Sequence, residues 1–335
     1  MQQPLIILTG PTATGKTKLS IALAKAVNGE IISADSMQVY KYMNIGSAKV
    51  RPEEMDGIRH YLTDVLEPTQ DFNIVLFQQY AKAAITEIYD RGKIPILVGG
   101  TGFYIQSVLY DIDFSESEED TALRRELESL ARERGAEYLH AMLAECDPKS
   151  AAAIHANNIK RVIRAIEFYR QTGERISEHN EAEREKPPAY NACYFVLSDV
   201  RARIYENIDR RVDGMIAEGL VNEVKMLMEM GCRRESTAMQ GLGYKEIMDY
   251  LSGDISLEEA VYRIKRDTRH FAKRQLTWFR RERDVVWLEK DKFAYDDKKM
   301  LNYMITLLDS RAIRSNTGMR DAMKQNTVEK GSFYR

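Results

Sequence analysis

The chain has 335 residues, a formal net charge of −2 and 44% hydrophobic residues. This length predicts one large α/β domain with an insertion, or two domains, and the average charge does not by itself favour a nucleic-acid partner. The sequence contains no run of 18 consecutive apolar residues, so it predicts no membrane span. We therefore expect a cytoplasmic protein without a membrane partner. The three cysteines, Cys146, Cys193 and Cys232, form no C-x-x-C pair, which argues against a disulfide framework or a zinc finger.

Short apolar runs and helical patterns alternate over the first third of the chain. The expected elements are strands at 5–8, 30–34 and 94–98, a helix after Lys16, and helices at about 72–90 and at 102–109. This alternation predicts an α/β fold with a P-loop NTPase-like parallel sheet and flanking helices. Because ligands of such sheets lie beyond the carboxyl ends of the strands, the loops at 10–17, 35–38 and 99–101 are expected to meet at one site.

The composition changes at about residue 114, first to an acidic stretch and then to charged helical sequence. We interpret residues 114–188 as an inserted, mostly helical domain that ends at a Lys-Pro-Pro turn. The remaining expectations are a strand at 192–197, helices at 204–230 and 257–283, and a last strand at 285–288. The catalytic core would therefore comprise 1–113 and 189–309, and 310–335 would be a polar, disordered tail.

Residues 10–17 read Gly-Pro-Thr-Ala-Thr-Gly-Lys-Thr, which matches G-x-x-x-x-G-K-[ST] between an expected strand and an expected helix. The glycines let the backbone bend around phosphates, Lys16 adds a positive charge, and the Thr17 hydroxyl can ligate Mg²⁺. The positive end of the helix dipole favours the same anion. The pattern predicts a diphosphate or triphosphate site at Gly10, Thr12, Ala13, Thr14, Gly15, Lys16 and Thr17.

Asp35 and Thr101 follow the other two strands of this expected site. A carboxylate facing a phosphate loop can hold Mg²⁺ through water or accept a proton, but Asp35 could equally cap a turn. The Thr101 hydroxyl could bond a substrate, cap the helix that follows, or do both. No aspartate ends the third strand, so Asp35 is the best candidate carboxylate.

Basic residues crowd into the segment from 263 to 283, where the only acids are Asp267 and Glu282. Aromatic residues are interleaved with them, which favours a surface for phosphate backbones over a salt-bridged solvent face. A second basic group begins at Lys160, with Arg124 and Arg125 earlier in the insertion. Together the two groups predict two jaws around a long polyanion.

Six segments match the sequence motifs of one enzyme family in the same order along the chain, at 10–17, 33–40, 44–49, 98–104, 239–246 and 273–280. Over about residues 4 to 308 the chain resembles the bacterial tRNA dimethylallyltransferases, the tRNA adenine N6-isopentenyltransferase family. The resemblance implies that a dimethylallyl group passes from dimethylallyl diphosphate to N6 of the adenine 3′ of the anticodon, with diphosphate released and Mg²⁺ as cofactor. It also implies that Asp35 is the base, that Thr101 lies near the reacting centre and that Arg211 contacts the diphosphate.

The resemblance further implies that the insertion clasps the anticodon stem-loop of tRNA. The implied tRNA-binding residues are Asp35, Ser36, Met37, Gln38, Thr101, Arg124, Lys160, Arg161, Arg164, Gln240, Gly243, Lys245, Lys273, Arg274, Gln275, Trp278 and Arg280. We expect a monomer. Three alternatives stay open: a P-loop small-molecule kinase, a nucleotide-dependent RNA-binding module, and an enzyme that prenylates free adenine nucleotides.

Overall fold

The structure is a computed structural model that describes residues 2–114 and 121–313. The chain divides into two compact units, unit 1 with Met1–Leu109 and Ala189–Arg335, and unit 2 with Tyr110–Pro188. The acidic stretch at 115–120 and the expected tail from 314 onward lie outside the described residues. The start of that expected tail is ordered, because a helix extends to Ser310 and Ile313 is fully buried.

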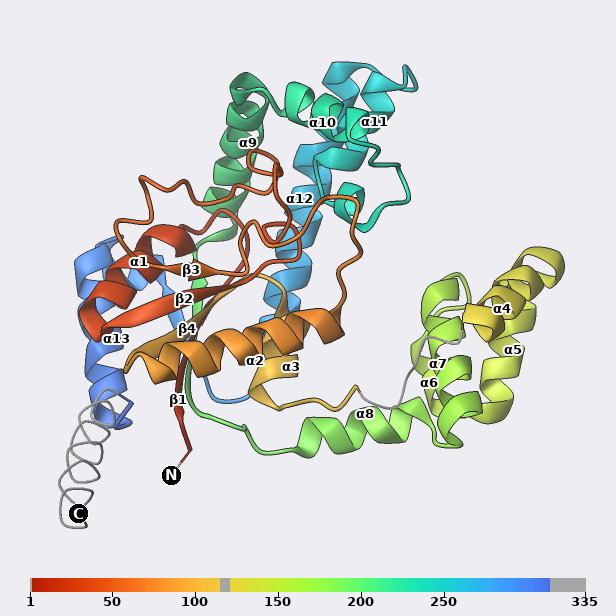
Figure 1. The fold of residues 1–335 in the computed structure, drawn as a ribbon, viewed down its shortest axis with the longest axis horizontal. Coiled ribbons are helices and arrows are strands. Elements are labelled where there is room, and N and C mark those ends of the chain that lie inside the picture. Colours follow the sequence, from red (N-terminus) through yellow and green to blue (C-terminus); the bar gives the residue numbers. More distant parts are fainter. Residues whose placement is uncertain (1, 115–120, 314–335) are drawn as a thin grey trace, which may run out of the picture. The chain divides into compact units, whose positions relative to one another are not determined.

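Unit 1 is built on one parallel sheet of six strands, in the order β3-β2-β4-β1-β5-β6 (Figure 1). The strands are β1 Pro4–Thr9, β2 Gly29–Ala34, β3 His60–Tyr61, β4 Ile94–Gly99, β5 Asn191–Ser198 and β6 Val285–Glu289. The five strands expected from the sequence are confirmed. The two residues of β3 were not predicted, because so short a strand carries no alternating pattern.

The predicted helices of unit 1 are found in the expected order with two corrections, and two further helices, at 244–251 and 297–310, were not predicted. The helices are α1 Lys16–Val27, α2 Ile74–Asp90, α3 Gly102–Leu109, α9 Arg201–Glu218, α10 Leu220–Glu229, α11 Tyr244–Leu251, α12 Leu257–Phe279 and α13 Asp297–Ser310. The single helix expected at 204–230 is divided at Gly219, whose φ of 103° ends α9 in a left-handed cap. The second correction is that α12 ends at Phe279 and not at residue 283.

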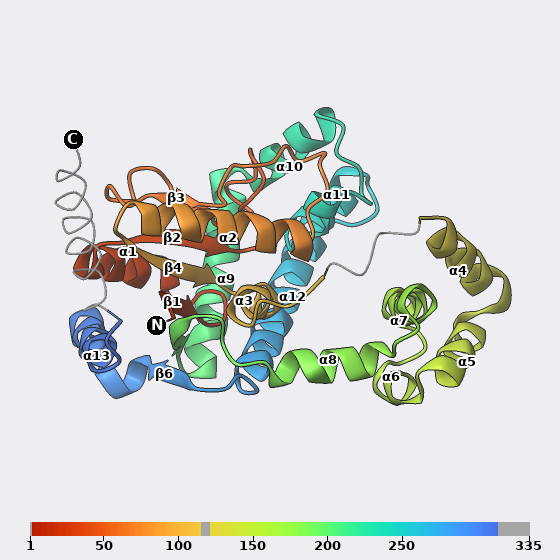
Figure 2. The same ribbon diagram turned by 60° about the horizontal axis from the view of Figure 1, so that its bottom comes forward.

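Helices cover both faces of the sheet, as the two views in Figures 1 and 2 show. On one face, Ile6 and Leu8 of β1 share a buried cluster with residues of α1 and α13. Their chain neighbours Leu5 and Ile7 are also fully buried, so they point to the opposite face, where α2 contacts β2 and β4. Such a continuous apolar strand is typical of a parallel sheet that is buried on both faces.

Unit 2 consists of helices with a hydrophobic core of their own. They are α4 Thr121–Arg134, α5 Ala136–Cys146, α6 Pro148–Ala153, α7 Ile159–Thr172 and α8 Ile176–Glu185. The buried Asp147 carboxylate accepts hydrogen bonds from Ser150 at the start of α6 and from Ser177 at the start of α8, so it caps one helix and joins two. Throughout the described part of both units, every helix is too short or too polar to cross a membrane.

Candidate functional site

Three loops leave the carboxyl ends of neighbouring strands. Gly99 pairs with Thr9 of β1 on one side of β4 and with Ala34 of β2 on the other, so the three strands end at the same edge of the sheet. The loops that follow them, at 10–15, 35–38 and 99–102, are called the strand-end loops below. Their convergence was predicted from the rule that ligands of open α/β sheets bind beyond the strand ends.

The first strand-end loop is held closed by bonds to its own backbone. The Lys16 ammonium donates hydrogen bonds to the carbonyls of Gly10 at 2.9 Å and Pro11 at 2.8 Å. The Thr14 hydroxyl also donates to Pro11, at 2.8 Å. Gly10 cannot carry a side chain, because its φ is 143° and a Cβ there would lie 2.1 Å from the carbonyl oxygen of Leu197 in β5. The loop conformation is therefore set before any ligand arrives.

Lys16 lies in an environment that disfavours its charge. Burial, and after it the nearby Arg211 guanidinium, lower the pKa of Lys16 to about 7, although the Asp35 carboxylate acts in the opposite direction. A bound phosphate group would return the pKa toward its ordinary value, because an anion favours the charged ammonium. Lys16 is therefore well placed to bind an anionic ligand.

A Mg²⁺ ion fits this loop without a protein cage. Among the described residues, no cluster of three or more His, Cys, Asp or Glu side chains could hold a metal ion. Thr17 is exposed at the start of α1, and within the described chain its hydroxyl makes no hydrogen bond. Thr17 would therefore hold the ion together with phosphate oxygens and water, which is how Mg²⁺ is commonly bound at such loops.

Side chains from two distant segments also reach the first loop. The Arg211 guanidinium donates to the Thr12 hydroxyl at 3.3 Å, and Asn207, one turn earlier on α9, donates to the Ala13 carbonyl at 3.3 Å. Lys290, which follows β6, donates to the Thr14 carbonyl at 3.3 Å. Sequence reasoning named Arg211 but missed the other two. The i, i+4 spacing from Arg211 and the position of Lys290 after a strand were the available signals.

Asp35 uses one carboxylate oxygen for a turn and leaves the other open. Oδ1 accepts hydrogen bonds from the backbone N–H groups of Met37 at 2.8 Å and Gln38 at 3.3 Å. Within the described residues, Oδ2 makes no hydrogen bond. Burial raises the pKa of Asp35, and this effect exceeds the opposing effects of the two backbone bonds and of the Lys16 charge. The turn-capping alternative is thus correct, and it is compatible with a role as a base.

Thr101 lies beside Asp35 at the start of α3. Its backbone N–H donates to the Ala34 carbonyl at 3.3 Å, and its carbonyl accepts from Tyr104 and Ile105 in the first turn of the helix. The Thr101 hydroxyl makes no hydrogen bond in the part of the chain that the structure describes. The expected side-chain cap is therefore not formed, and the hydroxyl stays available to a ligand.

The residues after Asp35 pack against protein on one side. Gln38 accepts a hydrogen bond from Ser33 at 3.0 Å, and its amide donates to the carbonyls of Ser47 at 3.3 Å and Ala48 at 3.4 Å. Ser36 and Met37 are half-buried. The Gln38 amide is therefore fully used within the protein, and its predicted contact with RNA would require these bonds to rearrange.

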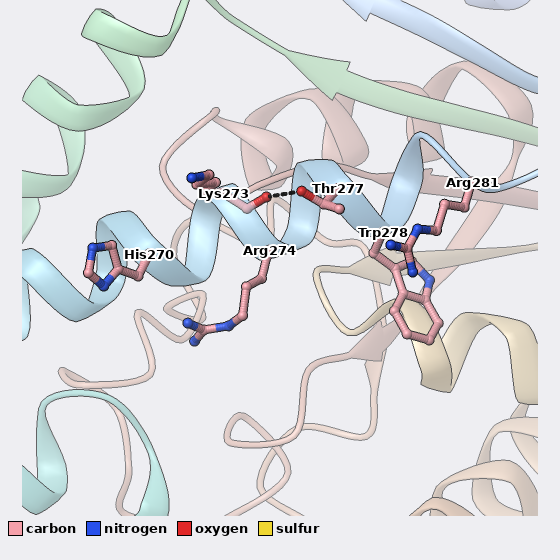
Figure 3. A pocket seen from close by; sticks show the side chains of 6 residues that line it. All are labelled: His270, Lys273, Arg274, Thr277, Trp278 and Arg281. Carbon is pink, nitrogen blue, oxygen red and sulfur yellow. Dashed lines mark hydrogen bonds between the residues drawn. The ribbon is translucent and has the colours of Figure 1, made fainter. Parts of the chain in front are cut away.

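Outer residues of α12 line an open hollow of about 380 Å³ (Figure 3). This α12 hollow is lined by His270, Lys273, Arg274, Thr277, Trp278 and Arg281. Lys273 and Arg274 are exposed, and neither forms an ion pair within the described residues. The Trp278 ring contacts α3, since a Cβ on Gly102 would lie 2.2 Å from it. The hollow thus combines free cations with an aromatic ring next to the third strand-end loop.

The first half of α12 is different and corrects a sequence argument. Lys265 pairs with Asp213 at 2.6 Å and Arg269 pairs with Asp209 at 2.6 Å, both across to α9. Arg266 pairs with Asp267 at 2.8 Å. The scarcity of acids within the segment had suggested that the whole helix is unpaired. Two of these acids come from α9 and Asp267 from α12 itself, so the salt-bridged alternative holds for this half, and Lys273 and Arg274, unpaired within the described residues, lie in the second half.

The segment at 240–245 adjoins a buried carboxylate that the sequence did not reveal. Glu223 of α10 accepts hydrogen bonds from the backbone N–H groups of Asn44, Ile45 and Gly46 at 2.8–3.1 Å and from the Tyr244 hydroxyl at 2.9 Å. These bonds join the loop at 44–46 to α10 and α11. Of the residues predicted here, Gln240 is exposed and bonds Arg234, Gly243 precedes α11 and is buried, and Lys245 pairs with Glu246 at 3.4 Å.

The predicted basic residues of unit 2 do not form one uniform group. Arg124 makes two hydrogen bonds, at 2.8 and 3.0 Å, to the buried carboxylate of Glu167. Lys160 and Arg161 are exposed in the first turn of α7, and Arg164 is half-buried one turn later. Within the described residues, Lys160 and Arg161 form no ion pair, so these two are the better candidates for contact with a polyanion.

Comparisons with known proteins agree on one family. The model of the IPP transferase family matches residues 38–282. A tRNA dimethylallyltransferase of Lachnoclostridium phytofermentans is 60% identical over 311 residues, which cover 93% of this chain and 99% of that protein. The crystal structure of the full-length tRNA isopentenylpyrophosphate transferase of Bacillus halodurans shares 43% identity and a TM-score of 0.69, covering 93% of this chain and 98% of that one. A structure of a eukaryotic dimethylallyltransferase acting on tRNA shares 30% identity and a TM-score of 0.73, covering 86% of this chain and 74% of that one.

Proposed function

The chain belongs to the IPP transferase family, and from that premise we propose that it transfers a dimethylallyl group from dimethylallyl diphosphate to N6 of the adenine 3′ of the anticodon in tRNA. Its relatives at 52–60% identity are tRNA dimethylallyltransferases, and an enzyme that transfers this group to tRNA accounts for the site described above. The donor, the acceptor atom and the roles of single residues are the finer parts of the proposal.

The observation that carries the proposal is the meeting of two unlike groups at one sheet edge. A loop with Lys16 at its centre suits a diphosphate, and beside it Asp35 has an open oxygen and a raised pKa. A diphosphate that departs as a leaving group needs positive charge, whereas the attacking amine needs a group that accepts its proton. The two requirements match the two groups.

The chemistry would proceed with the C–O bond of the donor breaking and a C–N bond to the adenine forming. Lys16, Arg211 and the backbone N–H groups of the first loop would stabilise the charge on the departing diphosphate. A Mg²⁺ ion at Thr17, when bound, would add a further positive charge there. Asp35 would accept the proton that N6 loses, and Thr101 would bond the base or the donor with its free hydroxyl.

The adenine must leave the stack of the anticodon loop before it can reach Asp35. Flipping a base costs a few kcal/mol, which contacts with the protein offset. The α12 hollow offers free cations for the RNA backbone and Trp278 as an aromatic surface. We extend the RNA-binding proposal to Lys160 and Arg161 of unit 2. A tRNA substrate also agrees with the expected cytoplasmic location, and the monomeric state stays a prediction.

Mass spectrometry tests the proposal directly. The purified protein would be incubated with unmodified tRNA, Mg²⁺ and dimethylallyl diphosphate, and the RNA would then be digested. We expect a dimethylallyl adduct on the adenosine next to the anticodon. Turnover of ATP without such an adduct would support the kinase alternative, and binding of RNA without either reaction would support the RNA-binding module.

A further inference from the structure

Gln275 lies on α12 between residues of the α12 hollow, but its side chain faces the interior. Only 6% of Gln275 is exposed, and it shares the buried side of the helix with Ala272 and Phe279, which lie three positions before and four positions after it. Its neighbours Lys273 and Arg274 are exposed and line the hollow. One helix therefore carries the hollow on its outer side and Gln275 on its inner side.

The carboxamide of Gln275 joins two strand-end loops. Its Oε1 accepts a hydrogen bond from the Thr12 backbone N–H at 2.9 Å, and its Nε2 donates to the Gly100 carbonyl at 2.9 Å. A Cβ at position 100 would lie 2.2 Å from Nε2, so a larger residue there would displace the Gln275 amide. The contacts are thus close on both sides of the amide.

Only a carboxamide satisfies both partners. A backbone N–H donates and a backbone carbonyl accepts, so the side chain must offer one acceptor and one donor at the two ends of one planar group. A carboxylate in its place would face the Gly100 carbonyl with a second acceptor. An apolar side chain would leave two partly buried backbone groups without this partner. The amide orientation of Gln275 is therefore determined by its neighbours.

We propose that Gln275 couples RNA binding at the α12 hollow to diphosphate binding in the strand-end loops. The inference rests on the proposed function. It makes Gln275 a positioning residue that does not itself touch RNA or donor, in place of the tRNA contact that the resemblance implied, because the side chain is buried and both ends of its carboxamide bond protein backbone. A polyanion held by Lys273 and Arg274 acts on α12, and the inner side of the same turn holds Thr12 and Gly100. Thr12 also bonds Arg211, so a change at α12 reaches a proposed diphosphate contact.

Such coupling has a measurable size and is reciprocal. If bound RNA changes the affinity for diphosphate by some factor, bound diphosphate must change the affinity for RNA by the same factor. Couplings between two sites of a protein are commonly about 5- to 150-fold. We expect a factor in this range, with each ligand strengthening the binding of the other.

The test uses isothermal titration calorimetry on the full-length protein with inorganic diphosphate and Mg²⁺. The dissociation constant is measured with and without a saturating, unmodified anticodon stem-loop RNA, and the ratio of the two constants is the coupling factor. Gln275→Met preserves the length of the side chain but removes both hydrogen bonds, so its factor should fall to about 1. Gln79→Met is the control, because it makes the same substitution at an exposed position of α2, outside both regions, and should keep the wild-type factor.

A wild-type factor of 1 would overturn the inference, and this measurement needs no variant. An unchanged factor in Gln275→Met, with folding verified by circular dichroism, would overturn it as well. If Gln275→Met does not fold, Gln275→Asn replaces it, since its shorter side chain cannot span both partners. Failure of wild-type protein to bind diphosphate would refute the proposed function together with the coupling, whereas binding with a factor of 1 would refute the coupling alone.

Discussion

The strand-end loops and the α12 hollow both belong to unit 1, but they differ in whether their polar groups are bonded within the protein. In the loops, Lys16, Asp35 and the Thr12 backbone N–H each bond a protein partner. In the hollow, Lys273 and Arg274 are exposed and, within the described chain, form no ion pair. Chemistry at a reacting centre gains from groups held in place, whereas capture of a long polyanion gains from charges that are free to follow it. The two regions should therefore respond to substitution in different kinetic terms.

The largest effect is expected at Asp35, because a general base supplies about 10²- to 10⁴-fold in rate. Asp35→Ala should lower kcat by that order and leave the affinity for tRNA unchanged, as measured by single-turnover transfer and by fluorescence anisotropy. Asp35→Asn is the matched variant, since its carbonyl oxygen can still accept from Met37 and Gln38. An Asn variant with the wild-type rate would show that Asp35 only caps the turn.

Glu223 tests whether fixed positioning extends beyond the strand-end loops. Glu223→Gln replaces one of the two acceptor oxygens with an NH₂ group, which cannot accept a hydrogen bond, so at least one N–H group at 44–46 loses its acceptor and we expect a loss of about 1–3 kcal/mol in the free energy of unfolding. Urea denaturation would measure it. Glu218→Gln is the control, because it removes an exposed ion pair with Arg51 and should change stability by less than about 1 kcal/mol. Equal losses in the two variants would argue against the positioning role.

The two halves of α12 allow free and paired charges to be compared within one helix. Arg274→Gln removes a free charge of the hollow and should reduce the slope of log affinity for tRNA against log salt by about 1. Arg266→Gln removes a charge that is paired with Asp267 and should change the slope less. Filter binding between low and physiological salt would measure both. Equal changes would mean that the ion pairs in the first half open when RNA binds.

The smallest expected effect is the uptake of a fraction of a proton by Lys16 when diphosphate binds. The pKa of Lys16 is lowered to about 7. In the free protein, most Lys16 side chains are therefore neutral amines at pH 8 and charged ammonium groups at pH 6. A diphosphate stabilises the charged form, so its binding should take up more protons from the buffer at pH 8 than at pH 6. Calorimetry in buffers of different ionisation enthalpy would measure the uptake. The absence of a pH difference would show that Lys16 is already charged before the ligand binds.

Much of the fold was predictable because the relevant patterns are local. Consecutive apolar residues at 5–8 and 94–98 define strands, and the glycine spacing at 10–17 defines a phosphate loop. Positions outside such patterns were missed. The two-residue strand β3 has no period to detect, and Gly219 divides a helical pattern that continues on both sides of it.

The candidate site was predictable in its loops but not in the contacts that join them. The rule for parallel sheets placed Asp35, Thr101 and the loop of Lys16 at one edge, since all three directly follow strands. No such rule indicates that Asp209 and Asp213 pair with two basic residues of α12, or that Lys290 reaches the first loop.

The sequence by itself determined the strand order along the chain, the phosphate loop and the carboxylate beside it, because each is encoded in a few adjacent residues. Only the tertiary structure decided which basic residues stay free and which are paired, and that Gln275 bonds Thr12 across 263 positions of the chain. The physical reason is that hydrogen bonds and ion pairs depend on distances in space, and folding brings together residues whose local sequences carry no information about each other.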